Sequence, residues 1–270
     1  MTRNARRVLL ALALAALAAS LGGCHHRAKI VDLQNESLYE QGQKMLDKRH
    51  FLESIKVLGD VGMNAPVSED LDPLVKLALA DAYYFQTGSV TLVEAQSRYE
   101  QFLNFYPLHP KARYARFMIG VCLLDQADSP DNDQEFSLKA LNHFQAMVDE
   151  LPADDPFGRA ARSMLLRAQD RLSEHEWIVG RFYLEKKHLE GAAGRFAELT
   201  DKYPGSRRRP QALYELAKVR LALGQHAAAR EALDRLAAEH PGSDWARKGA
   251  ELKTAIPETA APAGNGATGR

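Results

Sequence analysis

The chain has 270 residues with 35 basic and 35 acidic side chains, so its formal net charge at pH 7 is zero. A near-neutral chain has no electrostatic basis for binding nucleic acid, because that binding rests on neutralising phosphates with Lys and Arg. Only two cysteines are present, Cys24 and Cys122. Cys122 lies in an apolar helical pattern, so we predict a small buried hydrophobe there. Since we expect Cys24 to be modified, no disulfide should form within the chain.

The first 23 residues have the pattern of a cleaved export signal. Three arginines precede an apolar run at residues 8–17, which is too short to span a bilayer. A Leu-Gly-Gly-Cys sequence follows at residues 21–24 and resembles the bacterial lipobox. An ordinary secretory signal with an incidental cysteine is the alternative. We predict a lipoprotein signal peptide over residues 1–23 and a diacylglyceryl lipid on Cys24, with about 0.8 kcal/mol of membrane binding per buried methylene.

Two segments at the ends of the mature chain are expected to lie outside the fold. Residues 24–36 form a polar linker, of which the twelve residues 25–36 span at most about 40 Å when extended, which would keep the folded part near a membrane. His25 and His26 within it have no further ligands nearby in sequence, so we predict no metal site. Residues 255–270 are mainly Ala, Pro, Gly, Thr and Asn, and we predict a disordered tail there.

Residues 37–254 carry a helix–turn–helix pattern that recurs five times. The clearest copy runs from Glu176 to Pro204 and has small residues where two helices would approach, then a proline that ends the unit. This is the tetratricopeptide pattern of about 34 residues. The paired small residues of the five copies are Gly42 and Ser54, Ala80 and Ala95, Gly120 and Ala140, Gly180 and Ala192, and Ala217 and Ala229. Twelve residues after the second small residue, the copies have Pro66, Pro107, Pro152, Pro204 and Pro241.

The second helix of each copy also carries two large apolar side chains, three residues apart. They are Leu58 and Val61, Tyr99 and Phe102, Phe144 and Met147, Phe196 and Leu199, and Leu233 and Leu236. These residues alternate with charged ones at helical period, which predicts core positions. We therefore predict an all-α, continuous tetratricopeptide solenoid of about five repeats, closed by a capping helix from Asp244 to about Thr254.

Three departures from the regular period predict local changes. The second copy has extra residues and should contain a longer turn around Gln86 to Thr91. The third carries a polar stretch at residues 127–133, which predicts an exposed loop. Asp155 should cap a helix that Pro156 opens. No proline follows until after Lys187, so we expect one unusually long helix there, or two nearly collinear ones.

The sequence contains no recognisable catalytic motif. It has no glycine-rich phosphate loop, no His-Glu-x-x-His, no Gly-x-Ser-x-Gly and no Cys-x-x-Cys. A repeat stack offers long surfaces rather than closed pockets. We predict a binding protein that is not an enzyme and has no cofactor beyond the lipid on Cys24, with an unrecognised hydrolase as the poorer alternative.

Several stretches resemble the BamD family, outer-membrane assembly lipoproteins of the β-barrel assembly machinery. They are Ala82–Tyr84, Phe105–Pro110, Tyr114–Gly120 and Arg171–Glu176, with Val179 and Phe182–Tyr183. The likeness covers roughly Cys24 to Lys253. The chain departs from the family in the extra residues near Thr87 to Val93, at Gly180-Arg181 and in its tail. Because of these departures, the resemblance does not define which partner the surfaces near the extra residues would bind, although it still implies the fold.

The resemblance implies a periplasmic scaffold that is lipid-anchored to the outer membrane. Such a scaffold would bind the barrel-forming BamA subunit, accept other Bam lipoproteins, and receive unfolded outer membrane proteins for folding and insertion. The family's contact to the barrel subunit includes an arginine in the second helix of the fourth repeat, which corresponds to Arg195 here. A solvated surface arginine is the alternative for that residue. For the whole chain, the alternative is a tetratricopeptide lipoprotein that coordinates cell-wall or cell-division proteins.

A peptide-binding surface is predicted on the first helices of the first three repeats. Counting from the small positions places six residues on or near the inner surface: Tyr39, Asp81, Tyr84, Phe85, Phe117 and Leu124. Aromatic side chains bring large contact area with little rotamer entropy, which suits capture of the aromatic-rich C-terminal segment of a barrel substrate. The alternative is that these rings only pack one helix on the next.

Overall fold

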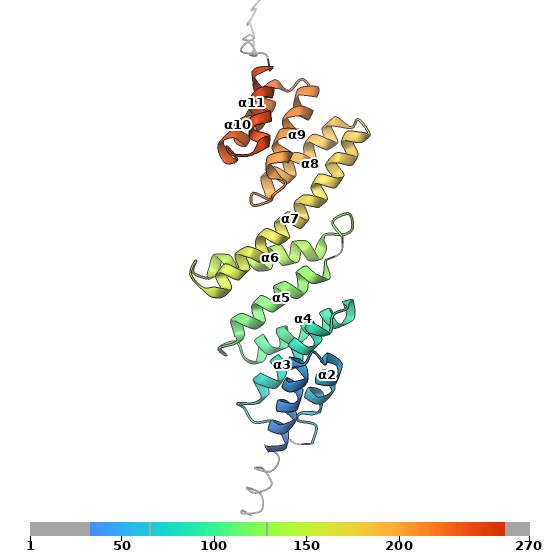
Figure 1. Ribbon diagram of the computed structural model, residues 1–270, viewed down its shortest axis with the longest axis vertical. Coiled ribbons are helices and arrows are strands. Elements are labelled where there is room, and N and C mark those ends of the chain that lie inside the picture. The colour runs from blue at the N-terminus through green and yellow to red at the C-terminus, as the bar shows by residue number, and fades with distance from the viewer. Residues whose placement is uncertain (1–32, 65, 128, 257–270) are drawn as a thin grey trace, which may run out of the picture. The chain divides into compact units, whose positions relative to one another are not determined.

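A computed structural model describes residues 33–64, 66–127 and 129–256, which form helices and short connections without a strand (Figure 1). Residues 33–47 are helical and are followed by α2 (Phe51–Asp60), α3 (Asp72–Gln86), α4 (Ser89–Phe105), α5 (Ala112–Gln126), α6 (Glu135–Glu150), α7 (Pro156–Glu185), α8 (Leu189–Lys202), α9 (Arg209–Ala222), α10 (His226–Glu239) and α11 (Asp244–Thr254). The predicted all-α tetratricopeptide class is confirmed. Among these residues, no helix is both long and apolar enough to cross a membrane.

The described residues form two compact units, which divide between Cys122 and Leu123, inside α5. In the first unit α2 packs on α3 and α3 packs on α4, around a small core that includes Leu58, Ala78 and Ala82. In the second unit each helix from α6 to α10 packs on the next along the chain, and α11 packs on α9 and α10. The predicted capping helix is thus confirmed, over the same residues.

Every predicted small position is buried, as the register requires. Two glycines show why a larger residue does not fit. A Cβ atom on Gly42 would lie 2.5 Å from Leu58, and one on Gly180 would lie 2.6 Å from the ring of Phe196. The large positions are buried too, except Val61, which is half-buried because it lies just beyond the end of α2. Helix packing therefore confirms the repeat pattern.

The predicted long helix is a single one. Helix α7, the long yellow helix in Figure 1, has 30 residues. The Asp155 side chain caps it by accepting hydrogen bonds from the backbone N–H groups of Phe157 at 2.8 Å and Gly158 at 3.0 Å, and Pro156 occupies its first turn. Helix α7 packs on both α6 and α8.

The prediction of a longer turn in the second repeat is wrong. Only Thr87 and Gly88 separate α3 from α4, and both adopt positive φ, 55° and 131°. Glycine tolerates such a conformation, which lets the chain reverse within two residues. The extra residues instead lengthen α4, which has 17 residues against 14 in the corresponding α8.

Each of the two predicted flanking segments overlaps the fold at one end. The last four residues of the predicted linker, 24–36, are already helical, and Asn35 among them is buried. At the other end, Ile256 lies within the predicted tail, 255–270, but is only 5% exposed. Its carbonyl oxygen accepts a hydrogen bond from Arg230 at 2.6 Å. The core therefore extends one apolar residue further than composition indicates. The rest of both segments, and the predicted signal peptide, lie outside the described residues.

Candidate partner-binding surfaces

Arg195 lies on α8 in the second unit and is held by carboxylates of its own chain. Its Nη1 atom donates to Glu176 Oε2 at 3.1 Å and lies 3.6 Å from Glu198 Oε2. Its side chain is 38% exposed, whereas that of Glu176 is 9% exposed. The hydrogen bond to Glu176, with the charges of both carboxylates, raises the pKa of Arg195. The guanidinium is thus partly exposed and is held by two carboxylates of its own chain.

The helix packing explains this ion pair. Glu176 and Arg195 each precede an aromatic residue of the core, Trp177 and Phe196, whose rings contact at 5.3 Å. Neighbouring positions on a helix lie about 100° apart, so a residue next to a core position sits at the edge of the buried face. When the two rings meet, the preceding charged residues are brought together at that edge.

A hollow of about 600 Å³ lies beside this pair, between α6, α7 and α8. We call it the α6–α8 groove. It is lined by Asp133, Gln134, Glu135, Leu138, Leu141, Leu172, His175, Glu176, Glu198, Lys202 and Tyr203. Sequence reasoning missed the groove, because its lining comes from three helices and no single helix shows the pattern.

The loop before α6 forms one wall of the groove. Its described residues are mostly exposed, as predicted for the polar stretch 127–133. Two side chains one turn apart on α7 nevertheless hold its backbone: Arg171 Nη2 donates to the carbonyl oxygen of Ala127 at 2.5 Å, and His175 Nδ1 lies 2.6 Å from that of Pro130. The loop is therefore tied to α7 at two points.

In the first unit, Asp81 is engaged within the fold. Its Oδ1 atom accepts hydrogen bonds from Tyr99 Oη at 2.5 Å and from Tyr114 Oη at 2.8 Å. Burial raises the pKa of Asp81, and burial together with the nearby carboxylate raises the pKa of both tyrosines. Asp81 thus joins α3 to α4 and α5, which makes it a packing residue whatever else it contacts.

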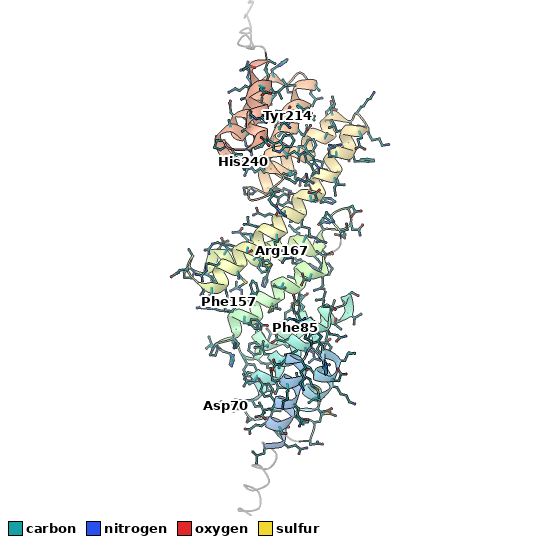
Figure 2. The ribbon with its side chains drawn as sticks, viewed as in Figure 1. Asp70, Phe85, Phe157, Arg167, Tyr214 and His240 are labelled. Carbon is teal, nitrogen blue, oxygen red and sulfur yellow. The ribbon has the colours of Figure 1, made fainter. Side chains whose placement is uncertain are left out.

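Of the predicted aromatic residues, Phe85 is the most accessible. It is 43% exposed at the end of α3 and is labelled in Figure 2. Its ring stacks on Phe51 at 5.8 Å and meets Tyr84 edge-on at 5.2 Å. A hollow of about 510 Å³ lies beside it, lined by Leu46, Asp47, Arg49, Phe51 and Phe85. Sequence reasoning missed Phe51, which comes from α2 rather than from a first helix.

The other predicted peptide-binding residues are less exposed. Tyr39 is half-buried against the core of Leu58, Ala78 and Ala82, and its hydroxyl accepts a hydrogen bond from Gln43. Tyr84 and Phe117 are also half-buried. Leu124 is 6% exposed and belongs to the second unit. The structure therefore brings together Tyr84 and Phe85, with Asp81 one turn away on the same helix.

Cysteine and metal chemistry add little to these surfaces. Cys122 is buried, as predicted. In the part of the chain that the structure describes, no cluster of three or more His, Cys, Asp or Glu side chains could hold a metal ion. Cys24, His25 and His26 lie outside that part.

A family model described as an outer membrane lipoprotein, YfiO, matches residues 31–236. The chain belongs to the YfiO family. The matched span includes Arg195, the α6–α8 groove and the hollow beside Phe85. Membership of this family associates the chain with the outer membrane.

Relatives of this YfiO-family chain carry a common name, outer membrane protein assembly factor BamD. The relative from Caulobacter vibrioides is 27% identical over 244 residues, covering 88% of this chain and 78% of the relative. That from Rickettsia prowazekii is 25% identical, covering 83% and 88%. That from Neisseria meningitidis serogroup A is 26% identical, covering 82% and 85%. The resemblance to BamD is confirmed.

Proposed function

We propose that this protein is a scaffold of outer membrane β-barrel assembly, anchored by lipid to the outer membrane and facing the periplasm. It binds a BamA-type barrel subunit and can bind other Bam lipoproteins. It also receives unfolded outer membrane proteins. The observation that carries the proposal is the family match over residues 31–236. It is supported by relatives that are named outer membrane protein assembly factors and that this chain matches over most of their length. Coordination of cell-wall or division proteins is the competing function.

Depleting the protein from cells separates these two functions. If it assembles barrels, the heat-modifiable, folded forms of outer membrane β-barrel proteins should fall together, while their unfolded precursors accumulate in the periplasm. Gel mobility of unheated outer membrane samples measures the folded fraction. Normal folded barrels in depleted cells with altered septation or wall cross-linking would instead support the competing function.

The contact to the barrel subunit is proposed at Arg195. A guanidinium offers five N–H donors in a fixed plane. Glu176 engages Nη1 and holds the side chain in one orientation, so a carboxylate of the partner can accept from the remaining donors. Preorganisation of this kind lowers the entropy lost on binding.

The hollow beside Phe85 is proposed to receive the C-terminal segment of a substrate. A stacked pair, Phe51 and Phe85, presents an exposed ring edge beside a space large enough for another aromatic side chain. Arg49 lines the same hollow together with Asp47, and its guanidinium can pair with the terminal carboxylate of the peptide. An extended peptide with aromatic residues near its end fits this combination of groups.

Replacing Phe85 by Ser should weaken binding of such a peptide about three- to tenfold, because an aromatic pair contributes about 0.5–1.5 kcal/mol beyond the area it buries. Fluorescence anisotropy of a labelled peptide measures the change. Phe105→Ser is the matched control, since Phe105 is an exposed phenylalanine outside the hollow. Equal affinity of wild type, Phe85→Ser and the double variant Tyr84→Ala/Phe117→Ala, all folded, would exclude a peptide site in the first three repeats.

Replacing Cys24 by Ala should release the folded protein from the membrane. The thiol is the proposed attachment for the lipid, and two or three acyl chains account for stable anchoring. Fractionation into periplasm and membranes after a high-salt wash measures the change, and circular dichroism of the released protein checks its fold. A variant that stays in the washed membrane pellet would show that Cys24 is not the sole attachment.

A further inference from the structure

Four large apolar side chains of the first unit are exposed to solvent. Leu33 is 59% exposed, Met63 73%, Phe105 66% and Leu108 96%. Leu108 lies between α4 and α5, and its side chain protrudes with almost no contact to its own chain. Single exposed apolar residues are common, whereas several on one surface mark contact with a protein or a membrane. Where these four lie relative to one another therefore matters.

The side chain of Asn35 brings the first two together. Asn35 lies in the first turn of the same helix as Leu33. It donates a hydrogen bond to the carbonyl oxygen of Pro66 at 3.4 Å and accepts one from the backbone N–H of Gly62 at 3.1 Å. These bonds hold the start of that helix against the connection between α2 and α3, which contains Met63.

The other two are fixed beside the same connection. It leads to the start of α3, where Asp72 accepts hydrogen bonds from Lys76 at 2.7 Å and from Tyr106. The Lys76 ammonium also lies 5.7 Å from the centre of the Phe105 ring. The end of α4 is therefore held beside the start of α3, and Leu108 follows shortly after. All four side chains belong to one edge of the first unit, which we call the N-terminal edge: Leu33, Met63, Phe105 and Leu108.

The N-terminal edge is close in sequence to the proposed lipid. Leu33 is nine residues from Cys24, so the two residues lie at most about 30 Å apart. A bilayer that holds the lipid on Cys24 is thus within reach of this edge. Such tethering raises the effective concentration of the edge at the bilayer, so even a weak contact is populated.

The charge of this edge favours an apolar contact over an electrostatic one. The connections that follow α2 and α4 carry two exposed acids and one exposed base, Glu69, Asp70 and Lys111. Anionic lipids attract clusters of Lys and Arg, and these connections contain no such cluster. We therefore expect zwitterionic lipids to be sufficient for the contact.

We propose that the N-terminal edge rests on the outer membrane, with Phe105 and Leu108 inserted at the level of the lipid headgroups. The proposal rests on the lipid anchor proposed at Cys24. Two side chains bury less apolar surface than one myristoyl chain, which by itself binds a membrane only marginally. The lipid therefore stays necessary for attachment, and the edge determines how the attached first unit is oriented.

This orientation has a consequence for the hollow beside Phe85. Phe85 lies near the end of α3, and Asp70 in the N-terminal edge precedes its start; both are labelled in Figure 2. The intervening helix has 15 residues, which separates the hollow from the edge by about 20 Å. Contact of the edge with the bilayer places the hollow away from it, on the side from which a periplasmic peptide arrives.

The test uses the full-length, lipidated protein in vesicles of phosphatidylethanolamine and phosphatidylcholine, some of whose lipids carry a nitroxide quencher at headgroup depth. Leu108→Cys carries a polarity-sensitive fluorophore at the edge. Val90→Cys is the matched control, because Val90 is an apolar residue, 80% exposed, at the other end of α4. Cys122 is fully buried, so the introduced thiol is the one that reacts with the probe.

The probe at position 108 should emit at shorter wavelength and be quenched, whereas the probe at position 90 should remain in water. Flotation with the vesicles shows independently that the lipid anchor is present. If the protein floats and the probe at 108 is as unquenched as the probe at 90, the edge proposal is wrong and the anchor stands. That result would leave the edge to a protein partner. Equal quenching at both positions would also contradict the proposal, and protein that does not float would contradict both the anchor and the edge contact.

The double variant Phe105→Ser/Leu108→Ser tests the two side chains themselves, with the probe on Met63→Cys. Because it removes both inserted side chains, it should lower the equilibrium constant for the quenched state at least about tenfold. Val90→Ser, with the same probe, should leave that constant unchanged. Thermal melts check that each variant is folded, as expected for replacements of exposed residues. Unchanged quenching in the folded double variant would show that Phe105 and Leu108 do not enter the bilayer.

Discussion

Replacing Arg195 by Glu should lower the affinity for the barrel subunit's periplasmic domain on the order of 10²-fold, and more than Arg195→Ala does. Truncating one partner of a buried, hydrogen-bonded charge pair at an interface costs about 2–5 kcal/mol, and reversal adds repulsion to the lost pairing. Titration calorimetry of the wild-type and variant proteins measures the difference. Arg195→Lys should lie between wild type and Ala, because an ammonium keeps the charge without the planar fork.

The ion pair with Glu176 determines which controls this experiment needs. Arg195→Glu places three carboxylates together, at positions 176, 195 and 198, and one of them is nearly buried. The variant should therefore also melt at a lower temperature than wild type. Adding Glu176→Gln relieves that repulsion and should restore the melting temperature without restoring affinity. Recovery of full affinity in the double variant would show that Arg195 acts only through folding.

Replacing Gly180 by Leu should destabilise the second unit by at least about 1–3 kcal/mol, the usual cost of forcing extra methylenes into a packed core. The first added carbon alone would lie 2.6 Å from Phe196 Cε1 and 2.9 Å from Cδ1. Phe196 is fully buried and contacts Trp177, so the ring has no open space to move into. Neither α7 nor α8 can absorb the change without separating.

Gly194→Leu is the matched control for Gly180→Leu. Gly194 also lies in a helix of the same repeat, but a Cβ there would have no neighbour within 4 Å. Leucine has the better helix propensity, so this variant should be neutral or slightly stabilising. Thermal unfolding followed by circular dichroism compares the two. Equal melting temperatures for the two variants would mean that α7 and α8 do not cross at Gly180.

The repeat architecture was predictable because helix packing repeats in sequence. Each close crossing needs a small residue on both helices, so pairs such as Gly180 and Ala192 recur with large partners such as Phe196 at fixed offsets. The cap at Asp155 was predictable for a similar reason, since it depends on two neighbouring residues. Such signals come from neighbouring or regularly spaced residues, so they can be recognised without knowing which distant segments pack together.

The details of the candidate sites depend on contacts that no local pattern encodes. Glu176 and Arg195 are 19 residues apart, and only the meeting of their helices pairs them. The hollow beside Phe85 likewise needs Phe51 from another helix. An inserted residue can lengthen either a turn or a helix at the same spacing. Here Thr87 and Gly88 reverse the chain at positive φ, so the extra residues extend α4 and not the turn. The helical periodicity therefore predicted which residues lie near the surface of each helix, but it did not predict which residues of other helices they contact.

The most direct measurement of the proposed function is purification of the full-length, lipidated protein from outer membranes in mild detergent, followed by quantitative mass spectrometry of what remains bound. A BamA-type barrel subunit should be retained in near-equimolar amount with the wild-type protein and should be lost with Arg195→Glu. Retention of cell-wall or division proteins from both preparations, with no barrel subunit in either, would contradict the assignment to β-barrel assembly.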